Sequence, residues 1–159
     1  MIVLSRGDEP PAEADGPTPG PTGTAPADLG PLGRGQDGDL RFVANSLQCG
    51  LENVITAETR LAAEGQFCLV DVDVAHTGAA PIEWPLECQY LGLPDGQRLP
   101  PRAEATLLDP GSQAAFDVPM EPGKRYDEVG LIFDIPADAV PATVELHASC
   151  GSPGLVIAA

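Results

Sequence analysis

The chain has 159 residues, of which 43% are hydrophobic, so it is long enough for one domain with a core of its own. A net charge of −16, with only eight Lys and Arg, excludes nucleic acid as a partner, because a phosphate backbone would be repelled. Eighteen Gly and eighteen Pro exceed ordinary usage, which predicts that part of the chain does not pack.

The N-terminal quarter of the chain predicts a tether rather than a domain. Residues 1–7, MIVLSRG, are too short for a signal peptide or a membrane span, and we interpret them as the remnant of a membrane anchor, with an ordinary soluble N-terminus as the alternative. Residues 8–38 are rich in Pro, Gly, Ala, Thr and acids and lack hydrophobic periodicity, which predicts a disordered linker. The expected domain is therefore 39–159.

From residue 39 onward, short alternating runs are separated by Gly, Pro and Asp, a pattern that predicts strands. The expected strands are 39–49, 66–76, 81–91, 113–120, 128–136, 142–150 and 154–159. Residues 52–65 are expected to form a short helix or a broad loop, and Asp95-Gly96 and Pro110-Gly111 are expected to form tight turns. Together these elements predict an all-β, immunoglobulin-like antiparallel β-sandwich preceded by a disordered N-terminal linker.

The four cysteines, Cys49, Cys68, Cys88 and Cys150, all fall on the apolar side of an alternating run, so all four are expected to face the core. An even number of inward cysteines in a domain poor in aromatic residues favours two disulfides and an oxidising, extracytoplasmic compartment. Zinc is the competing interpretation, but the spacings of 19, 20 and 62 residues contain no C-x-x-C pair. The spacing leaves all three pairings open.

The runs CGLENV, EGQFCLVDVDVAHTG, LPDGQRL and GLIFDIPADAVPATVELHASCGSPGLVI, within about residues 38–158, resemble a bacterial extracytoplasmic family of unknown function. That family shares the telokin-like, immunoglobulin-related sandwich of mycobacterial immunoprotective extracellular antigens. Its members carry a membrane helix or lipid anchor, then a low-complexity linker, then the sandwich. The resemblance implies a disulfide between Cys49 and Cys68, which fit the family pattern, and one between Cys88 and Cys150, which both depart from it. It implies no catalytic residues.

Two histidines, His76 and His147, are the weak candidates for a metal site, which with Met120 and a cysteine would imitate a copper centre. His147 has outward parity, opposite Cys150, so these groups do not converge on one loop. Serines without a nucleophile-elbow sequence and two separated histidines form no recognisable triad, so neither an enzyme nor a cofactor is expected. Alternating Asp71 and Asp73 are interpreted as solvated acids on the outer face of a strand.

Trp84 is expected in the core, and it becomes the first candidate for binding only if it is exposed. The predicted function is a non-catalytic extracytoplasmic module, secreted or membrane-anchored, that presents an edge strand or loop surface to a protein or cell-envelope partner. Contact with the membrane is expected only through the possible N-terminal anchor. The alternative function is an extracytoplasmic copper-binding protein that uses His76 or His147.

Overall fold

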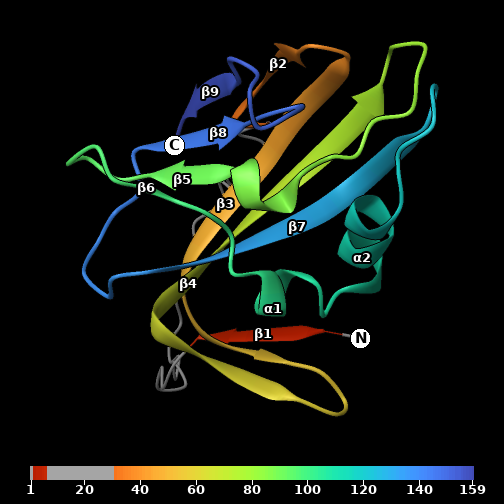
Figure 1. Ribbon diagram of the computed structural model, residues 1–159. Coiled ribbons are helices and arrows are strands. Elements are labelled where there is room, and N and C mark those ends of the chain that lie inside the picture. The colour runs from red at the N-terminus through yellow and green to blue at the C-terminus, as the bar shows by residue number, and fades with distance from the viewer. Residues whose placement is uncertain (1, 7–30) are drawn as a thin grey trace, which may run out of the picture.

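The computed structural model describes residues 2–6 and 31–159, which form two antiparallel sheets packed face to face (Figure 1). The elements are β1 Val3–Arg6, β2 Gly33–Asp37, β3 Leu40–Ile55, β4 Arg60–His76, the 3-10 helix η3 Leu86–Cys88, β5 Tyr90–Gly92, β6 Arg98–Leu99, α1 Ala103–Thr106, α2 Pro110–Asp117, β7 Arg125–Ile135, β8 Thr143–Leu146 and β9 Leu155–Ala158. The large sheet has the order β1-β3-β4-β7, with β2 also paired to β3, and the small sheet has the order β6-β5-β8-β9. The predicted all-β sandwich is confirmed.

The longest feature of the fold is the hairpin of β3 and β4, which pair antiparallel from Leu40 opposite His76 to Ile55 opposite Arg60. Residues 52–65, expected to form a helix or a broad loop, are the tip of this hairpin. Cross-strand pairing overrides the helix-forming residues there, because apolar side chains of both strands pack on one face.

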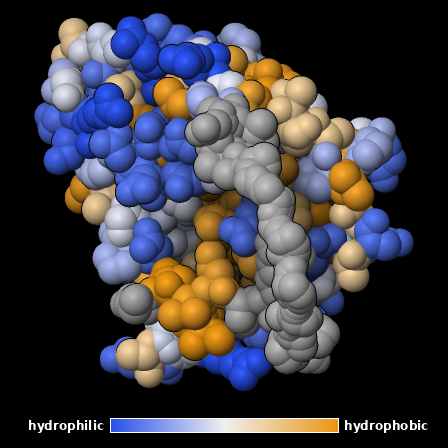
Figure 2. Space-filling model, turned by 180° about the vertical axis from the view of Figure 1, so that it is seen from behind, coloured by the Kyte–Doolittle hydropathy of each residue, from blue (hydrophilic) through white to orange (hydrophobic). Residues whose placement is uncertain are grey.

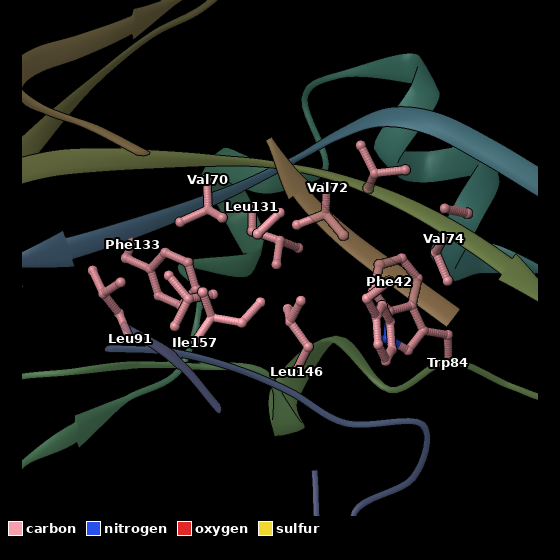
Figure 3. Packing of buried hydrophobic residues seen from close by; sticks show 14 of the residues in the cluster. Phe42, Val70, Val72, Val74, Trp84, Leu91, Leu131, Phe133, Leu146 and Ile157 are labelled. Carbon is pink, nitrogen blue, oxygen red and sulfur yellow. The ribbon is translucent and has the colours of Figure 1, made fainter. Parts of the chain in front are cut away.

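The main core lies between the two sheets (Figure 3). Val70, Val72 and Val74 of β4 are fully buried and point toward the small sheet, where Leu91 and Leu146 meet them. The alternation of these valines with outward acids was predicted from the sequence and is confirmed.

A second apolar cluster covers the opposite face of the large sheet near the tip of the hairpin. Leu51, Phe67 and Ile132 of the sheet are buried there beneath Ala105 of α1 and Leu4 of β1. The large sheet is therefore covered on both faces at this end.

Helices α1 and α2 cover the outer edge of β7. The Thr106 hydroxyl accepts a hydrogen bond from the Ile132 N–H at 2.9 Å, and the Ser112 hydroxyl donates to the Gly130 carbonyl at 2.9 Å. Side chains thus satisfy backbone groups that a bare edge strand would offer to another chain.

The prediction of a strand over 113–120 and a turn at Pro110-Gly111 is wrong, because Pro110–Asp117 form α2 and only Met120 makes a β-bridge, to Ile82. Asp109 caps this helix by accepting a hydrogen bond from the Ser112 N–H at 3.1 Å, and Pro110 occupies its first turn. The strand predicted over 81–91 is reduced to a single bridge at Ile82, then η3 and β5. Pro81 and Pro85 explain this, because proline has no backbone N–H to donate to a neighbouring strand.

The sandwich begins earlier than predicted, because β2 lies within the segment 8–38 that was interpreted as linker. Gly33 and Gly35 were interpreted as linker residues, but in the structure they allow β9 to pack closely against β2. A Cβ atom on Gly33 would lie 2.8 Å from the Ile157 side chain, and one on Gly35 would lie 2.7 Å from the Leu155 side chain. Residues 3–6, interpreted as the end of an anchor, form β1 and pair with the end of β3. Residues 7–30 of the predicted linker lie outside the described part of the chain.

Two disulfides, Cys49–Cys68 and Cys88–Cys150, have the pairing that the family resemblance implied. Cys68 and Cys88 are buried, Cys49 is half-buried and Cys150 is exposed, so the expectation that all four face inward is wrong for Cys150. Cys150 lies in the turn after β8, where strand alternation no longer applies.

We expect the double variant Cys88→Ala/Cys150→Ala to lose about 4 kcal/mol of unfolding free energy, and Cys49→Ala/Cys68→Ala about 3 kcal/mol, because the first disulfide closes the longer loop of the unfolded chain. Urea denaturation of both variants measures this. Equal losses, or a larger loss for the shorter loop, would contradict the loop-entropy account.

Candidate interaction surface

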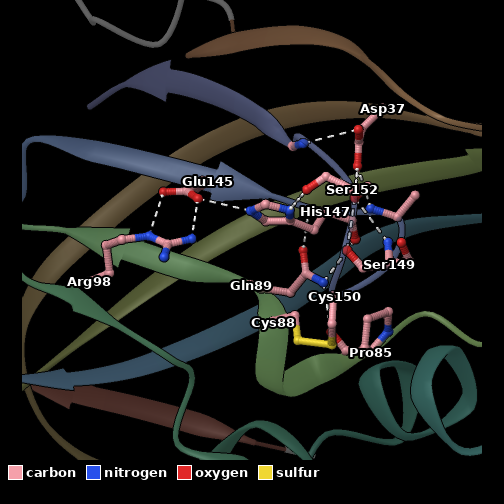
Figure 4. A network of polar contacts seen from close by, with 12 residues as sticks. Asp37, Pro85, Cys88, Gln89, Arg98, Glu145, His147, Ser149, Cys150 and Ser152 are labelled. Atoms are coloured by element: carbon pink, nitrogen blue, oxygen red, sulfur yellow. Dashed lines mark hydrogen bonds and ion pairs between the residues drawn. A yellow bond between two sulfur atoms is a disulfide. The ribbon is translucent and has the colours of Figure 1, made fainter.

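A network of polar contacts holds the turn that follows β8 (Figure 4). The Asp37 carboxylate, 4% exposed in β2, accepts hydrogen bonds from the Ala148 N–H at 2.7 Å and the Gly154 N–H at 3.0 Å. The Ser152 hydroxyl also donates to this carboxylate. The network therefore ties the large sheet to the C-terminal part of the small sheet.

His147 belongs to this network and is only 5% exposed, although it was predicted on the solvent face. The prediction failed because β8 ends at Leu146, and the alternation of faces ends with it. Its Nδ1 lies 3.0 Å from the Ser152 carbonyl oxygen and its Nε2 lies 2.9 Å from the Glu145 carboxylate. Both ring nitrogens are therefore engaged within the fold, and neither is free to bind a metal.

The two carboxylates of the network are held in their ionised form. The hydrogen bond from Arg98 lowers the pKa of Glu145 more than burial raises it, and His147 lowers it further. Burial is the largest influence on Asp37 and by itself raises its pKa. The hydrogen bonds from Ala148, Ser152 and Gly154 outweigh burial and keep the pKa below its ordinary value of 3.8.

The serine, histidine and aspartate of this network do not form a nucleophile with its base. The Ser152 hydroxyl donates to Asp37, and His147 contacts only the backbone carbonyl of Ser152. A catalytic arrangement requires the imidazole to accept the proton of the hydroxyl. These contacts stabilise the turn that follows β8.

His76 is also buried and has both ring nitrogens engaged. Its Nε2 donates to the Ala80 carbonyl at 2.6 Å, and its Nδ1 accepts from the Gly78 N–H at 3.0 Å. The predicted copper set also lacks a thiolate, because all four cysteines are in disulfides, and Met120 is fully buried in the core. The structure thus brings none of these candidates together as ligands.

Trp84 is confirmed as a core residue, with 2% of its surface exposed. Its ring stacks on Phe116 of α2 at 4.5 Å between centroids and lies 5.8 Å from Phe42. The buried Nε1 has no hydrogen-bond partner within residues 2–6 and 31–159. Because the indole is covered on its faces, it is not a platform for a ligand.

A groove of about 530 Å³ borders Arg102 and Asp134. Its polar groups are already paired with one another. Arg102 binds Asp134 at 2.7 Å, and the same carboxylate accepts from the backbone N–H groups of Glu64 and Gly65. A groove satisfied in this way has few polar groups left to orient a ligand.

A smaller hollow, of about 200 Å³, opens on the outer face of the large sheet between β1, β4 and β7. We call it the acid-rimmed hollow, and its lining consists of Ile2, Leu4, Leu69, Asp71, Asp109, Glu128, Gly130 and Ile132. Apolar side chains form its floor and three carboxylates stand around it, and among the side chains that the structure describes no Lys or Arg lines it. In the view from behind, apolar side chains reach the surface over the middle and lower part of the molecule (Figure 2).

The rim carries three acidic side chains, Asp71, Asp109 and Glu128. Burial raises the pKa of Asp71, the Asn45 amide lowers it through a hydrogen bond, and the charges of Glu128 and Asp73 raise it further. The net direction is upward, which means that the carboxylate is held at a cost in free energy. A cation supplied by a partner would remove that cost.

Glu128 reaches the rim from a strained backbone. Its φ of 58° is the only positive value for a non-glycine in the described part of the chain. The register of β7 against β4 shifts at this point, and the Glu128 N–H donates to Asp73 at 2.8 Å. Bulges of this kind redirect side chains, and strained residues concentrate at binding sites.

Sequence patterns showed only Asp71 and Asp73 of this region. Leu4 was interpreted as part of an anchor, and Asp109 as part of a turn. Glu128 and Ile132 were assigned to a strand whose register was unknown. Nothing local in the sequence signals that these segments meet.

Comparison of the chain with protein-family models, with curated proteins and with solved structures finds no match. The resemblance to the extracytoplasmic family stays a prediction from the quoted motifs.

We expect Asp37→Asn to lower the free energy of unfolding at pH 7 by about 2 kcal/mol, because three donors face this carboxylate and an amide can accept at one atom only. The native pKa of Asp37 is depressed, so its contribution is present above about pH 3.8 and is lost as the pH falls below that value. Urea denaturation between pH 7 and pH 3 should therefore show a difference that shrinks in acid.

Asp39→Asn is the matched control, since this carboxylate is exposed in the turn between β2 and β3, two residues from Asp37. It should leave stability nearly unchanged. A deficit for Asp37→Asn that stays constant down to pH 3 would show that the carboxylate charge is not what stabilises the turn.

Proposed function

We propose that this chain is a non-catalytic interaction module that acts outside the cytoplasm, secreted or held at the cell surface. The two disulfides support an oxidising compartment. Among the described residues no helix is long and apolar enough to cross a membrane. The partner is a protein or a component of the cell envelope.

The acid-rimmed hollow is the observation that carries this proposal. Its floor of Leu4, Leu69 and Ile132 has room for one bulky apolar side chain. Its rim of Asp71, Asp109 and Glu128 favours a positive group beside that side chain. Binding sites of this kind combine an apolar anchor with charged groups that set specificity. We therefore expect a partner segment in which a large apolar residue adjoins Lys or Arg.

The position of the hollow supports a binding role. Its floor and rim come from strands β1, β4 and β7 and from the capping residue of α2, so the surrounding scaffold holds their geometry. The copper alternative has less support, because both imidazoles use both nitrogens within the fold.

Random peptides displayed on phage and selected on the purified protein should be enriched in sequences with a bulky apolar residue next to Lys or Arg. The double variant Asp71→Asn/Glu128→Gln should bind the selected peptides about tenfold more weakly, which corresponds to about 1.4 kcal/mol. Fluorescence anisotropy with a selected peptide measures this difference.

The matched control is Glu83→Gln/Glu87→Gln, which removes the same charge from exposed positions outside the hollow. It should bind like the unmodified protein. Selected peptides that bind all three proteins equally would contradict the proposal.

Glu128→Gly separates strain from charge. Glycine accepts the positive φ of this position, so we expect the free energy of unfolding to rise by about 1 kcal/mol. Binding of a selected peptide should weaken, because one rim carboxylate is lost. Glu128→Gln should weaken binding without the gain in stability. A destabilised Glu128→Gly protein in urea denaturation would show that the residue is not strained.

A further inference from the structure

A second surface lies on the same outer face of the large sheet, at the end away from the hairpin tip. Three of the eight basic residues gather there, Arg34 of β2, Arg41 of β3 and Arg125 of β7, and we call this group the arginine corner. Arg41 is opposite Ala75, which is opposite Arg125, so the two arginines are two strands apart in one row.

Arg34 and Arg41 are diagonal neighbours on adjacent strands. Arg34 pairs with Val43, and Arg41 stands two positions before Val43 on β3. Diagonal neighbours of this kind lie roughly 7–8 Å apart and present their side chains on the same face. Both arginines are exposed.

The surface between the arginines is concave, and Asp73 lines it on the side toward Arg125. A hollow of about 280 Å³ is lined by Arg34, Gly35, Gln36, Arg41 and Val43. A smaller one, of about 70 Å³, continues past Val43 toward Arg125. An extended chain therefore finds space beside both guanidinium groups.

The charge of the corner is only partly compensated. Arg125 binds Asp127 at 2.6 Å and lies 3.9 Å from Asp73. Arg34 and Arg41 form no ion pair with any residue that the structure describes. In a chain with 24 acids and eight bases, two adjacent arginines without a described carboxylate partner form a local positive site.

We propose that the arginine corner binds an extended acidic segment of a partner protein, with carboxylates at every second residue. Side chains at i and i+2 of a strand point the same way and are about 7 Å apart, which matches the diagonal separation of Arg34 and Arg41. The planar guanidinium favours a carboxylate through two parallel hydrogen bonds. Within the described residues β2 pairs only with β3, so its outer edge lies beside the corner and suits an added strand.

This site is independent of the acid-rimmed hollow, because it uses other residues and the opposite charge. The test measures fluorescence anisotropy of a fluorescein-labelled peptide, Glu-Thr-Glu-Thr-Glu-Thr-Glu, with the full chain at low salt. The protein as a whole repels this peptide, so binding reports a local positive site. We expect Arg34→Gln/Arg41→Gln to weaken binding at least tenfold.

Matched controls separate the site from net charge. A peptide with four Glu in adjacent pairs separated by Thr has the same charge and the wrong spacing, and it should bind several-fold more weakly. Arg60→Gln/Arg98→Gln removes the same charge from other surfaces and should bind the alternating peptide as the unmodified protein does. Thermal denaturation checks that each variant is folded.

The proposal is overturned by any of three results: no binding of the alternating peptide, equal affinity for both peptides, or equal weakening in both double variants. Inorganic polyphosphate that binds more tightly than the peptide, with the same dependence on Arg34 and Arg41, would also overturn it, because the corner would then be a site for an anionic polymer. Failure of these experiments would not affect the peptide selection on the acid-rimmed hollow, because the peptides expected there are cationic.

Discussion

The antiparallel pairing of β3 with β4 over nearly their whole length is the constraint on which the rest of the structure depends. β1 and β2 attach to β3, β7 attaches to β4, and Cys49–Cys68 joins the two strands covalently. Because side chains alternate along a strand, this single pairing assigns each residue of the hairpin to one of two faces. The inner face meets the small sheet, and the outer face is left for a second cluster and for contacts with other molecules.

The outer face changes character along its length. Near the hairpin tip it is apolar and covered by α1 and β1, then it opens into the acid-rimmed hollow, and at the far end it carries the arginine corner. A long, twisted pair of strands therefore presents two surfaces of opposite charge on one rigid support. A rigid support loses little conformational entropy of its own on binding, which suits the interaction role proposed above.

The polar network at the C-terminal turn shows how a set of reactive residue types can be purely structural. Asp37, His147 and Ser152 are close together and mostly buried, yet the imidazole contacts only a backbone carbonyl and the Glu145 carboxylate, and the hydroxyl donates to Asp37. The network and Cys88–Cys150 secure the same turn from two sides. Such full satisfaction of buried polar groups stabilises a turn that has few apolar contacts of its own.

The sequence by itself determined the all-β sandwich, the buried position of Trp84 and the inward valines of β4, because alternation and turn residues act over a few neighbours. Cysteine number and composition also indicated two disulfides. Only the tertiary structure decided that Gly33 and Gly35 form a strand, since their role is to admit side chains of β9. It also decided the burial of His147, and it brought Leu4, Asp71, Asp109 and Glu128 to one hollow. These features depend on contacts between segments far apart in the chain and on the bulge at Glu128. Local sequence patterns predict neither of them.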